Sequence, residues 1–157
     1  MKTLQRLLAP SVVLVAAFAF FATPAEAVNV VVKTITIQFD TLDGGKAPLA
    51  AVSVMLQNGT GVIAASYEFA KGPLAANSTS PEFMLPATHG PVSTDDLRNF
   101  KVTVQLQAPP GKTATWRFKY NVTFRLANGA VITRPSAPCE LKSNSGGIAS
   151  LPREYHL

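Results

Sequence analysis

Apolar and polar side chains alternate with a period of two along most of the chain beyond residue 30. Val102 and Val104, for example, flank the polar residue Thr103. This spacing places apolar side chains on one face of an extended segment and polar ones on the other, which is typical of a half-buried β-strand. The pattern predicts strands at residues 34–39, 52–57, 63–69, 82–85, 100–107, 118–126, 130–133 and 139–142.

Turn signals separate these segments. Asn58-Gly59 and Asn128-Gly129 suit the positive backbone angles of tight hairpin turns, and residues 93–97 predict one helical turn. Short strands that each have one apolar face are expected to form two antiparallel sheets packed face to face. The predicted fold class is therefore an all-β antiparallel sandwich of about seven to eight strands. A small closed barrel is the alternative.

The first 27 residues have the three parts of an export signal. Lys2 and Arg6 form a cationic start, residues 12–21 are uncharged and apolar, and residues 25–27 form a small-x-small cleavage site. We therefore expect cleavage before Val28 and a periplasmic or extracellular protein. An uncut membrane anchor is the alternative, but the apolar run of about ten residues is short against the roughly twenty of a spanning helix.

Size and charge describe the exported part. Removal of the first 27 of the 157 residues leaves 130, a usual size for one domain. We assign this domain to residues 28–142 and expect a flexible tail at 143–157, where Ser, Asn and Gly become frequent. Without Lys2, Arg6 and Glu26, the 14 basic and 9 acidic side chains become 12 and 8, a net charge of about +4. This balance favours anionic surfaces, whereas the absence of a Lys or Arg run argues against nucleic acid.

Cys139 is the single cysteine, so no disulfide within the chain is expected. It is interpreted as a small apolar residue or an incidental thiol, and pairing between two chains is the alternative. The two histidines, His89 and His156, have no spacing to Cys139 or to a carboxylate that is typical of a nucleophilic site. We therefore expect a protein that is not an enzyme and needs no cofactor.

One predicted strand has a basic polar face. Arg117, Lys119 and Arg125 project from the side opposite its apolar residues, and Lys101 extends this patch if the two long strands are neighbours. The patch suggests recognition of an anionic lipid, glycan or protein surface, and an ordinary solvated sheet face is the alternative. Trp116, beside the loop 108–111, is either an exposed aromatic contact or a core residue.

Two pairs of carboxylates suggest a calcium site. Asp40 and Asp43 lie in a Gly-rich turn, and Asp95 and Asp96 lie in another loop. Carboxylate oxygens from two loops at one end of a sandwich are suitable ligands for Ca²⁺. The alternative is that each Asp forms hydrogen bonds to its local backbone, as Asp commonly does in turns.

Several short motifs together resemble PLAT/LH2-like and related C2-like β-sandwich modules of exported bacterial proteins. They are residues 34–37 (TITI), 40–45 (DTLDGG), 77–79 (NST), 93–98 (STDDLR) and Trp116. The resemblance implies a non-catalytic module that docks on lipids or proteins, in some members with calcium in the end loops. The chain departs from the pattern at Asp43, where a basic residue is usual, and at residues 113–115, where an Asp-Asn pair is common.

The sequence thus favours an exported, monomeric, non-catalytic binding module, because no set of nucleophile, base and oxyanion donors can be recognised. A structural or surface-assembly subunit of the cell envelope is the first alternative, since sandwich edges can accept a strand from a neighbouring chain. A small secreted hydrolase is the second alternative. No transmembrane segment is expected after cleavage of the signal.

Overall fold

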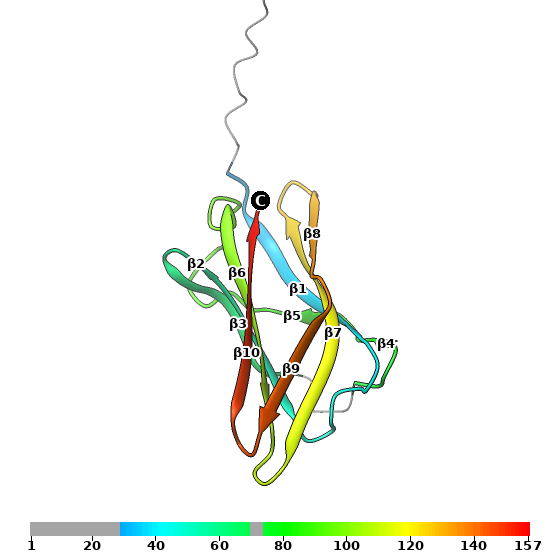
Figure 1. Cartoon of the computed structure of the whole chain (residues 1–157). Coiled ribbons are helices and arrows are strands. Elements are labelled where there is room, and N and C mark those ends of the chain that lie inside the picture. Colours follow the sequence, from blue (N-terminus) through cyan, green and yellow to red (C-terminus); the bar gives the residue numbers. More distant parts are fainter. Residues whose placement is uncertain (1–28, 70–73) are drawn as a thin grey trace, which may run out of the picture.

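The computed structural model describes residues 29–69 and 74–157, and these residues form ten β-strands and no helix (Figure 1). The predicted export signal lies outside the described residues. All eight predicted segments contain a strand, which confirms the reading of the alternation, whereas β4 and β10 were not predicted. The strands are β1 (Val32–Thr41), β2 (Ala51–Asn58), β3 (Gly61–Phe69), β4 (Ser78–Thr79), β5 (Phe83–Met84), β6 (Asn99–Gln107), β7 (Thr113–Leu126), β8 (Val131–Pro135), β9 (Cys139–Asn144) and β10 (Ile148–His156).

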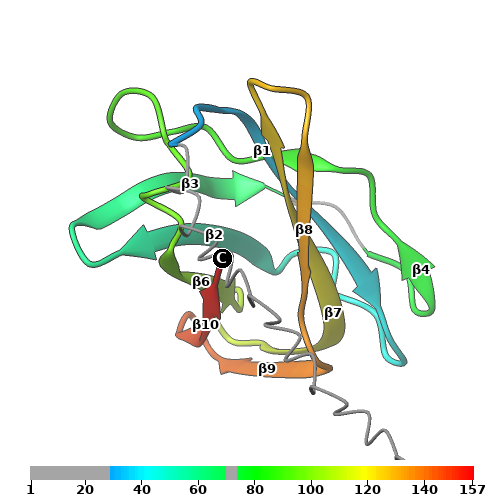
Figure 2. The ribbon, with the colours of Figure 1, turned by 90° about the horizontal axis from the view of Figure 1, so that it is seen from above.

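Two separate antiparallel sheets face each other, which confirms the predicted sandwich over the barrel. The larger sheet has the order β4-β1-β7-β8, with β5 also paired to β1 and β9 also paired to β7. The smaller sheet has the order β10-β6-β2-β3. Figure 2 shows the two layers from above, with β2, β3 and β6 in one and β1, β7 and β8 in the other. No helix in the described part of the chain is long and apolar enough to cross a membrane.

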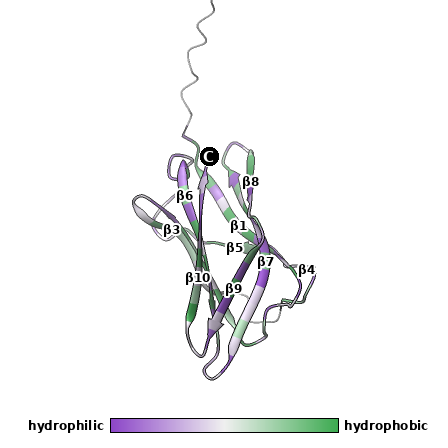
Figure 3. Cartoon of the chain, in the orientation of Figure 1, coloured by the Kyte–Doolittle hydropathy of each residue, from purple (hydrophilic) through white to green (hydrophobic). Residues whose placement is uncertain are grey.

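The interior of the sandwich contains the apolar side chains that the alternation assigned to one face. Phe39, Trp116 and Phe118 from the larger sheet and Val54 and Val104 from the smaller sheet are fully buried. The rings of Trp116 and Phe118 stack with their centroids 4.0 Å apart. In Figure 3 hydrophilic and hydrophobic residues both occur along strands such as β1, β6 and β7, as expected for strands with one buried face.

The chain crosses between the sheets on both sides of the sandwich. On one side β9 pairs with β7 in the larger sheet, and β10 then pairs with β6 in the smaller sheet. On the other side the segment after β5 leaves β1 and bonds to β3, where the Ala65 N–H donates to the Pro86 carbonyl at 3.1 Å and the Thr88 N–H donates to the Ile63 carbonyl at 3.0 Å. These crossings cover part of the open sides of the sandwich.

The prediction of a flexible tail at 143–157 is wrong. β9 continues to Asn144, and β10 pairs with the whole length of β6. Ala149, Leu151 and Tyr155 lie opposite apolar residues of β6 and pack against the core. The residues between them face outward. The polar composition that suggested a tail therefore belongs in part to the outer face of a strand.

Candidate functional site

Arg117, Lys119 and Arg125 lie on the outer face of the larger sheet, as the alternation along β7 predicts. Between them the outer face carries Asn121 and Thr123, and the hydroxyl of Thr123 is 3.1 Å from that of Thr133 on β8. The face thus presents hydroxyl, amide and charged groups.

The cations of this face are balanced by carboxylates. The Arg117 guanidinium donates to both oxygens of Asp43 at 2.8 and 2.6 Å, and its Nε lies 3.4 Å from a carboxylate oxygen of Glu140. Arg125 donates to both oxygens of Glu82 at 3.3 Å. Lys119 lies opposite Asp40 in the pairing of β1 with β7. A face with this arrangement has little excess positive charge with which to attract an anionic surface.

Two members of the predicted binding set lie elsewhere. Lys101 is on β6 in the smaller sheet, so the condition that its strand neighbours β7 is not met and it does not extend the patch. Trp116 has no exposed surface, and its indole N–H donates to the Thr41 hydroxyl at 3.3 Å. The core interpretation of Trp116 is therefore confirmed, and its assignment as an exposed contact is wrong.

The four aspartates of the suggested calcium site do not meet. Asp40 and Asp43 lie at the end of β1, whereas Asp95 and Asp96 follow Thr94, whose N–H donates to the carbonyl of Val30 just before β1 begins. A strand of this length separates the two pairs by about 30 Å. Within 29–69 and 74–157 no group of three or more metal-ligating side chains gathers. The suggested site combining both pairs is wrong.

Each aspartate has a partner within the protein instead. Asp40 accepts a hydrogen bond from the Thr79 hydroxyl at 2.7 Å, and Asp95 forms an ion pair with Arg98 at 3.0 Å. Asp96 accepts from both the backbone N–H and the hydroxyl of Ser93, at 2.9 and 2.8 Å. The contact of Asp96 with the Ser93 N–H is the local backbone bond that turn aspartates commonly form, whereas Asp40 and Asp95 bond to side chains.

The loop after β1 contains a buried cation of its own. Lys46 is 2% exposed, and its Nζ donates to the carbonyls of Ala50 at 2.6 Å and Ala47 at 3.1 Å. Burial lowers the pKa of this amine below its usual value. The ammonium group satisfies backbone carbonyls of the loop, which is a role that bound cations have in other loops.

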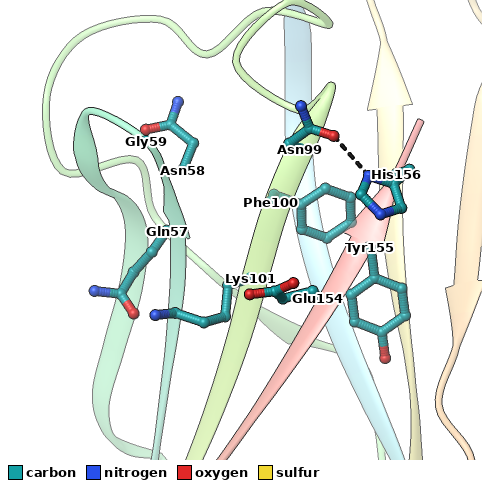
Figure 4. Close-up of a pocket in the computed structure, with 9 residues that line it drawn as sticks. All are labelled: Gln57, Asn58, Gly59, Asn99, Phe100, Lys101, Glu154, Tyr155 and His156. Atoms are coloured by element: carbon teal, nitrogen blue, oxygen red, sulfur yellow. Dashed lines mark hydrogen bonds between the residues drawn. The ribbon is translucent and has the colours of Figure 1, made fainter.

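A concave site lies on the outer face of the smaller sheet, where β2 and β10 end and β6 begins (Figure 4). Its volume is about 280 Å³. In the strand register Gln57, Lys101 and Glu154 stand side by side across three strands. We call this site the β2/β6/β10 pocket. Its lining residues are Gln57, Asn58, Gly59, Asn99, Phe100, Lys101, Glu154, Tyr155 and His156.

Hydrogen bonds hold the amides of the β2/β6/β10 pocket in place. Asn58 donates from Nδ2 to the carbonyl of Asp96 at 3.2 Å, and Gln57 accepts from the Thr103 hydroxyl at 3.4 Å. His156 Nδ1 lies 2.6 Å from Asn99 Oδ1, as the dashed line in Figure 4 shows. Since an amide oxygen only accepts, Nδ1 is the protonated nitrogen in this arrangement, and Nε2 faces away from the bond.

The two charged groups of the pocket remain available to a ligand. Among the described residues the side chains of Lys101 and Glu154 have no hydrogen bond or ion pair with another side chain or with the backbone. The aromatic residues contribute backbone rather than rings, because Phe100 is 2% exposed and Tyr155 directs its hydroxyl to Tyr120 inside the sandwich. The pocket therefore offers charged and amide groups on a floor of strand backbone.

A second cavity, of about 250 Å³, brings a histidine and a carboxylate together. His89, Asp96 and Thr60 are among its lining residues. However, Asp96 is bonded to Ser93, and the Thr60 hydroxyl donates to Asn58 at 2.6 Å rather than to the imidazole. The contact between a nucleophile and a base that hydrolysis requires is thus not formed here.

Sequence reasoning missed most of the β2/β6/β10 pocket. Glu154 and His156 fall in the segment that was predicted to be a tail, and Asn58 was assigned only to a turn. The available signal was the alternation of Ala149, Leu151 and Tyr155 with polar residues, which Arg153 interrupts on the inner face. Lys101 was identified, but with the wrong neighbours.

Comparison with known proteins gave no match to any protein-family description, curated protein or solved structure.

Proposed function

We propose that this chain is an exported, non-catalytic binding module and that its ligand occupies the β2/β6/β10 pocket. The observation that supports this function best is the pair Lys101 and Glu154, two opposite charges held side by side in a concave site without partners among the described residues. Exposed charges that face the same cavity are typical of polar ligand sites, where a few placed groups provide orientation and specificity.

The charges on the outer face of β7 are already balanced, which makes the β2/β6/β10 pocket the better candidate for the binding site. Arg117 and Arg125 already have carboxylate partners, so a ligand must compete with these ion pairs. Export itself rests on the signal in residues 1–27, and the resemblance to PLAT/LH2-like modules remains a prediction that agrees with a sandwich fold.

The alternative of an assembly subunit has less support. Strand addition needs a free edge with backbone donors. Pro152 of β10 and Pro135 of β8 both lie where the backbone nitrogen points away from the paired strand, and proline has no N–H to donate there. Prolines at such positions protect edges from pairing with another chain. Cys139 is 6% exposed, so a disulfide between chains requires β9 to open first.

Amide chemical shifts test this function directly. The ¹⁵N-labelled protein is titrated separately with anionic phospholipid vesicles, heparin, a neutral oligosaccharide and a basic and an acidic peptide. We expect at least one probe to shift the amides of Asn58, Lys101 and Glu154, and Lys101→Met to weaken that response. Shifts confined to the outer face of β7, or no response to any probe, contradict the proposal.

A further inference from the structure

We propose that the β2/β6/β10 pocket binds a neutral, hydroxyl-rich sugar residue through Glu154, Lys101, Gln57 and Asn99. This inference rests on the proposed function, because it names the ligand class of the same site. It differs from the expectation of an anionic partner that the net charge suggests.

The hydrogen-bonding groups of the pocket match those of a sugar. Both carboxylate oxygens of Glu154 are free to accept, and Lys101 has three N–H donors without partners in the described part of the chain. The amide nitrogens of Gln57 and Asn99 remain available because only the oxygens of these side chains are engaged. A sugar hydroxyl is both donor and acceptor, so neighbouring hydroxyls satisfy a carboxylate and an ammonium or amide group at the same time.

Charge balance argues for a neutral ligand. Lys101 and Glu154 are directly opposite on adjacent strands, so the site has one positive and one negative group at the same depth. An anionic ligand that approaches Lys101 also approaches Glu154, and the repulsion offsets much of the attraction. A neutral polyol meets both groups without this cost.

The walls argue against an apolar ligand. The ring of Phe100 is buried, and the ring of Tyr155 packs against the core with its hydroxyl bonded to Tyr120, so neither ring is a free aromatic platform for a ligand. The volume of about 280 Å³ lies just below the usual range for small-molecule pockets and suits a single ring rather than a long chain. Without an aromatic platform we expect weak binding, with Kd on the order of 1 mM.

The pocket is also held in its shape before any ligand arrives. Asn99 is fixed by His156 at 2.6 Å, and the hairpin at Asn58 is fixed by Asp96 and by the Thr60 N–H, which donates to Asn58 Oδ1 at 2.9 Å. A preformed site loses little conformational entropy on binding. The C-terminal strand β10 supplies Glu154 and His156, so the site exists only when β10 is paired.

The test is a set of NMR titrations of the labelled protein at tens of millimolar ligand. The probes are the methyl glycosides of glucose, galactose and N-acetylglucosamine, with sodium glucuronate as the anionic analogue and anionic vesicles as the lipid probe. We expect a neutral glycoside to shift the amides of Asn58, Lys101 and Glu154. Glu154→Gln and Lys101→Met should each weaken this binding about tenfold, because both remove charged hydrogen bonds. Lys112→Met, in the distant turn before β7, is the matched control and should bind as the parent protein does.

The outcomes separate the ligand class from the function. If glucuronate or vesicles shift the pocket amides and the neutral glycosides do not, the sugar inference is overturned while the binding function stands. If none of these probes shifts the pocket amides, and the peptides used to test the binding function do not shift them either, both proposals are overturned. A neutral glycoside whose affinity is unchanged in Glu154→Gln also overturns the inference, since the carboxylate is its main acceptor. Unchanged melting temperatures of the variants show that each result reflects binding and not folding.

Discussion

The hydroxyl of Tyr155 donates a hydrogen bond of 2.9 Å to the hydroxyl of Tyr120 and thereby joins β10 of the smaller sheet to β7 of the larger one. The Tyr120 side chain has no exposed surface, and the Tyr155 ring stacks on Phe100 with the centroids 5.3 Å apart. This bond lies directly behind the strand that carries Glu154 and His156. The position of the candidate site thus depends on a contact between the two sheets.

The first prediction concerns alkaline pH. Burial raises the pKa of Tyr120, and burial also raises the pKa of Tyr155. The folded state therefore keeps protons that the unfolded chain releases above about pH 10, so stability present below that pH is lost as the pH rises further. Of the three tyrosines, Tyr120 should ionise only together with unfolding in an ultraviolet titration, and Tyr155 should ionise at a higher pH than an exposed tyrosine. Ionisation of all three near pH 10 with the fold intact contradicts this arrangement.

A single substitution tests the hydrogen bond between Tyr155 and Tyr120. Tyr155→Phe removes the donor and should lower the free energy of unfolding by about 1 kcal/mol, the usual net value of one such hydrogen bond. Thermal melting at pH 7 measures this loss. The alkaline transition of the variant should still be present, because Tyr120 remains buried.

The second prediction concerns Trp116. It is the only tryptophan, it is fully buried, and its N–H has a partner in Thr41. Its fluorescence should therefore resist quenching by acrylamide until the protein unfolds, and Trp116→Ala should cost about 3–5 kcal/mol. Trp116→Phe, which keeps most of the apolar volume, is the milder companion variant. Strong quenching in the native protein contradicts the core position.

The alternation of side chains predicted the strands because each strand has one buried face, and eight segments were found in this way. It did not predict which strands are neighbours. Lys101 and Arg117 lie on strands that are consecutive in sequence but belong to different sheets. The sheet to which a strand belongs depends on how the long connections cross the sandwich. The local alternation of side chains does not predict these crossings.

β10 was missed for a related reason. Pro152 and Arg153 interrupt its pattern, yet the structure accommodates both, because Pro152 faces a free edge and Arg153 lies at the margin of the core with Nη2 3.9 Å from the sulfur of Cys139. Edge positions tolerate residues that are unfavourable in a central strand. The pocket residues Glu154 and His156 were not predicted because the strand that carries them was not predicted.

The third prediction concerns Lys46. Lys46→Ala removes the buried donor of the loop after β1 and should lower the free energy of unfolding by about 2–3 kcal/mol, since the Ala50 carbonyl loses its charged partner. Because the pKa of Lys46 is lowered on folding, its own titration makes the protein more stable as the pH rises towards 10.5, opposite in sign to the tyrosine effect. Denaturant unfolding at several pH values measures both. Lys112→Ala, on the surface, is the control, and an equal loss in both variants contradicts the buried role.

The fourth prediction concerns calcium and the Arg117–Asp43 pair. Asp43 is held by Arg117 and lies far from Asp95 and Asp96, so addition of Ca²⁺ at millimolar concentration should not raise the melting temperature. Asp43→Asn should change stability by less than about 1 kcal/mol, because the side chains of Arg117 and Asp43 are 47% and 68% exposed. A calcium-dependent rise in melting temperature that Asp43→Asn abolishes would show that the ion displaces Arg117.

The fifth prediction concerns the end of the chain. Removal of residues 148–157 deletes β10, which exposes one edge of β6, removes the ring of Tyr155 from Phe100 and uncovers Val104 opposite Leu151. We expect the shortened chain to lose cooperative thermal unfolding, because a two-sheet core of this size cannot spare an edge strand that covers part of it. Removal of Leu157 alone, which deletes one backbone hydrogen bond to Arg98, is the control and should cost only about 1 kcal/mol. A flexible tail predicts the opposite result, a shortened chain that melts as the parent does, so circular dichroism of the two truncated proteins distinguishes a structural strand from a dispensable tail.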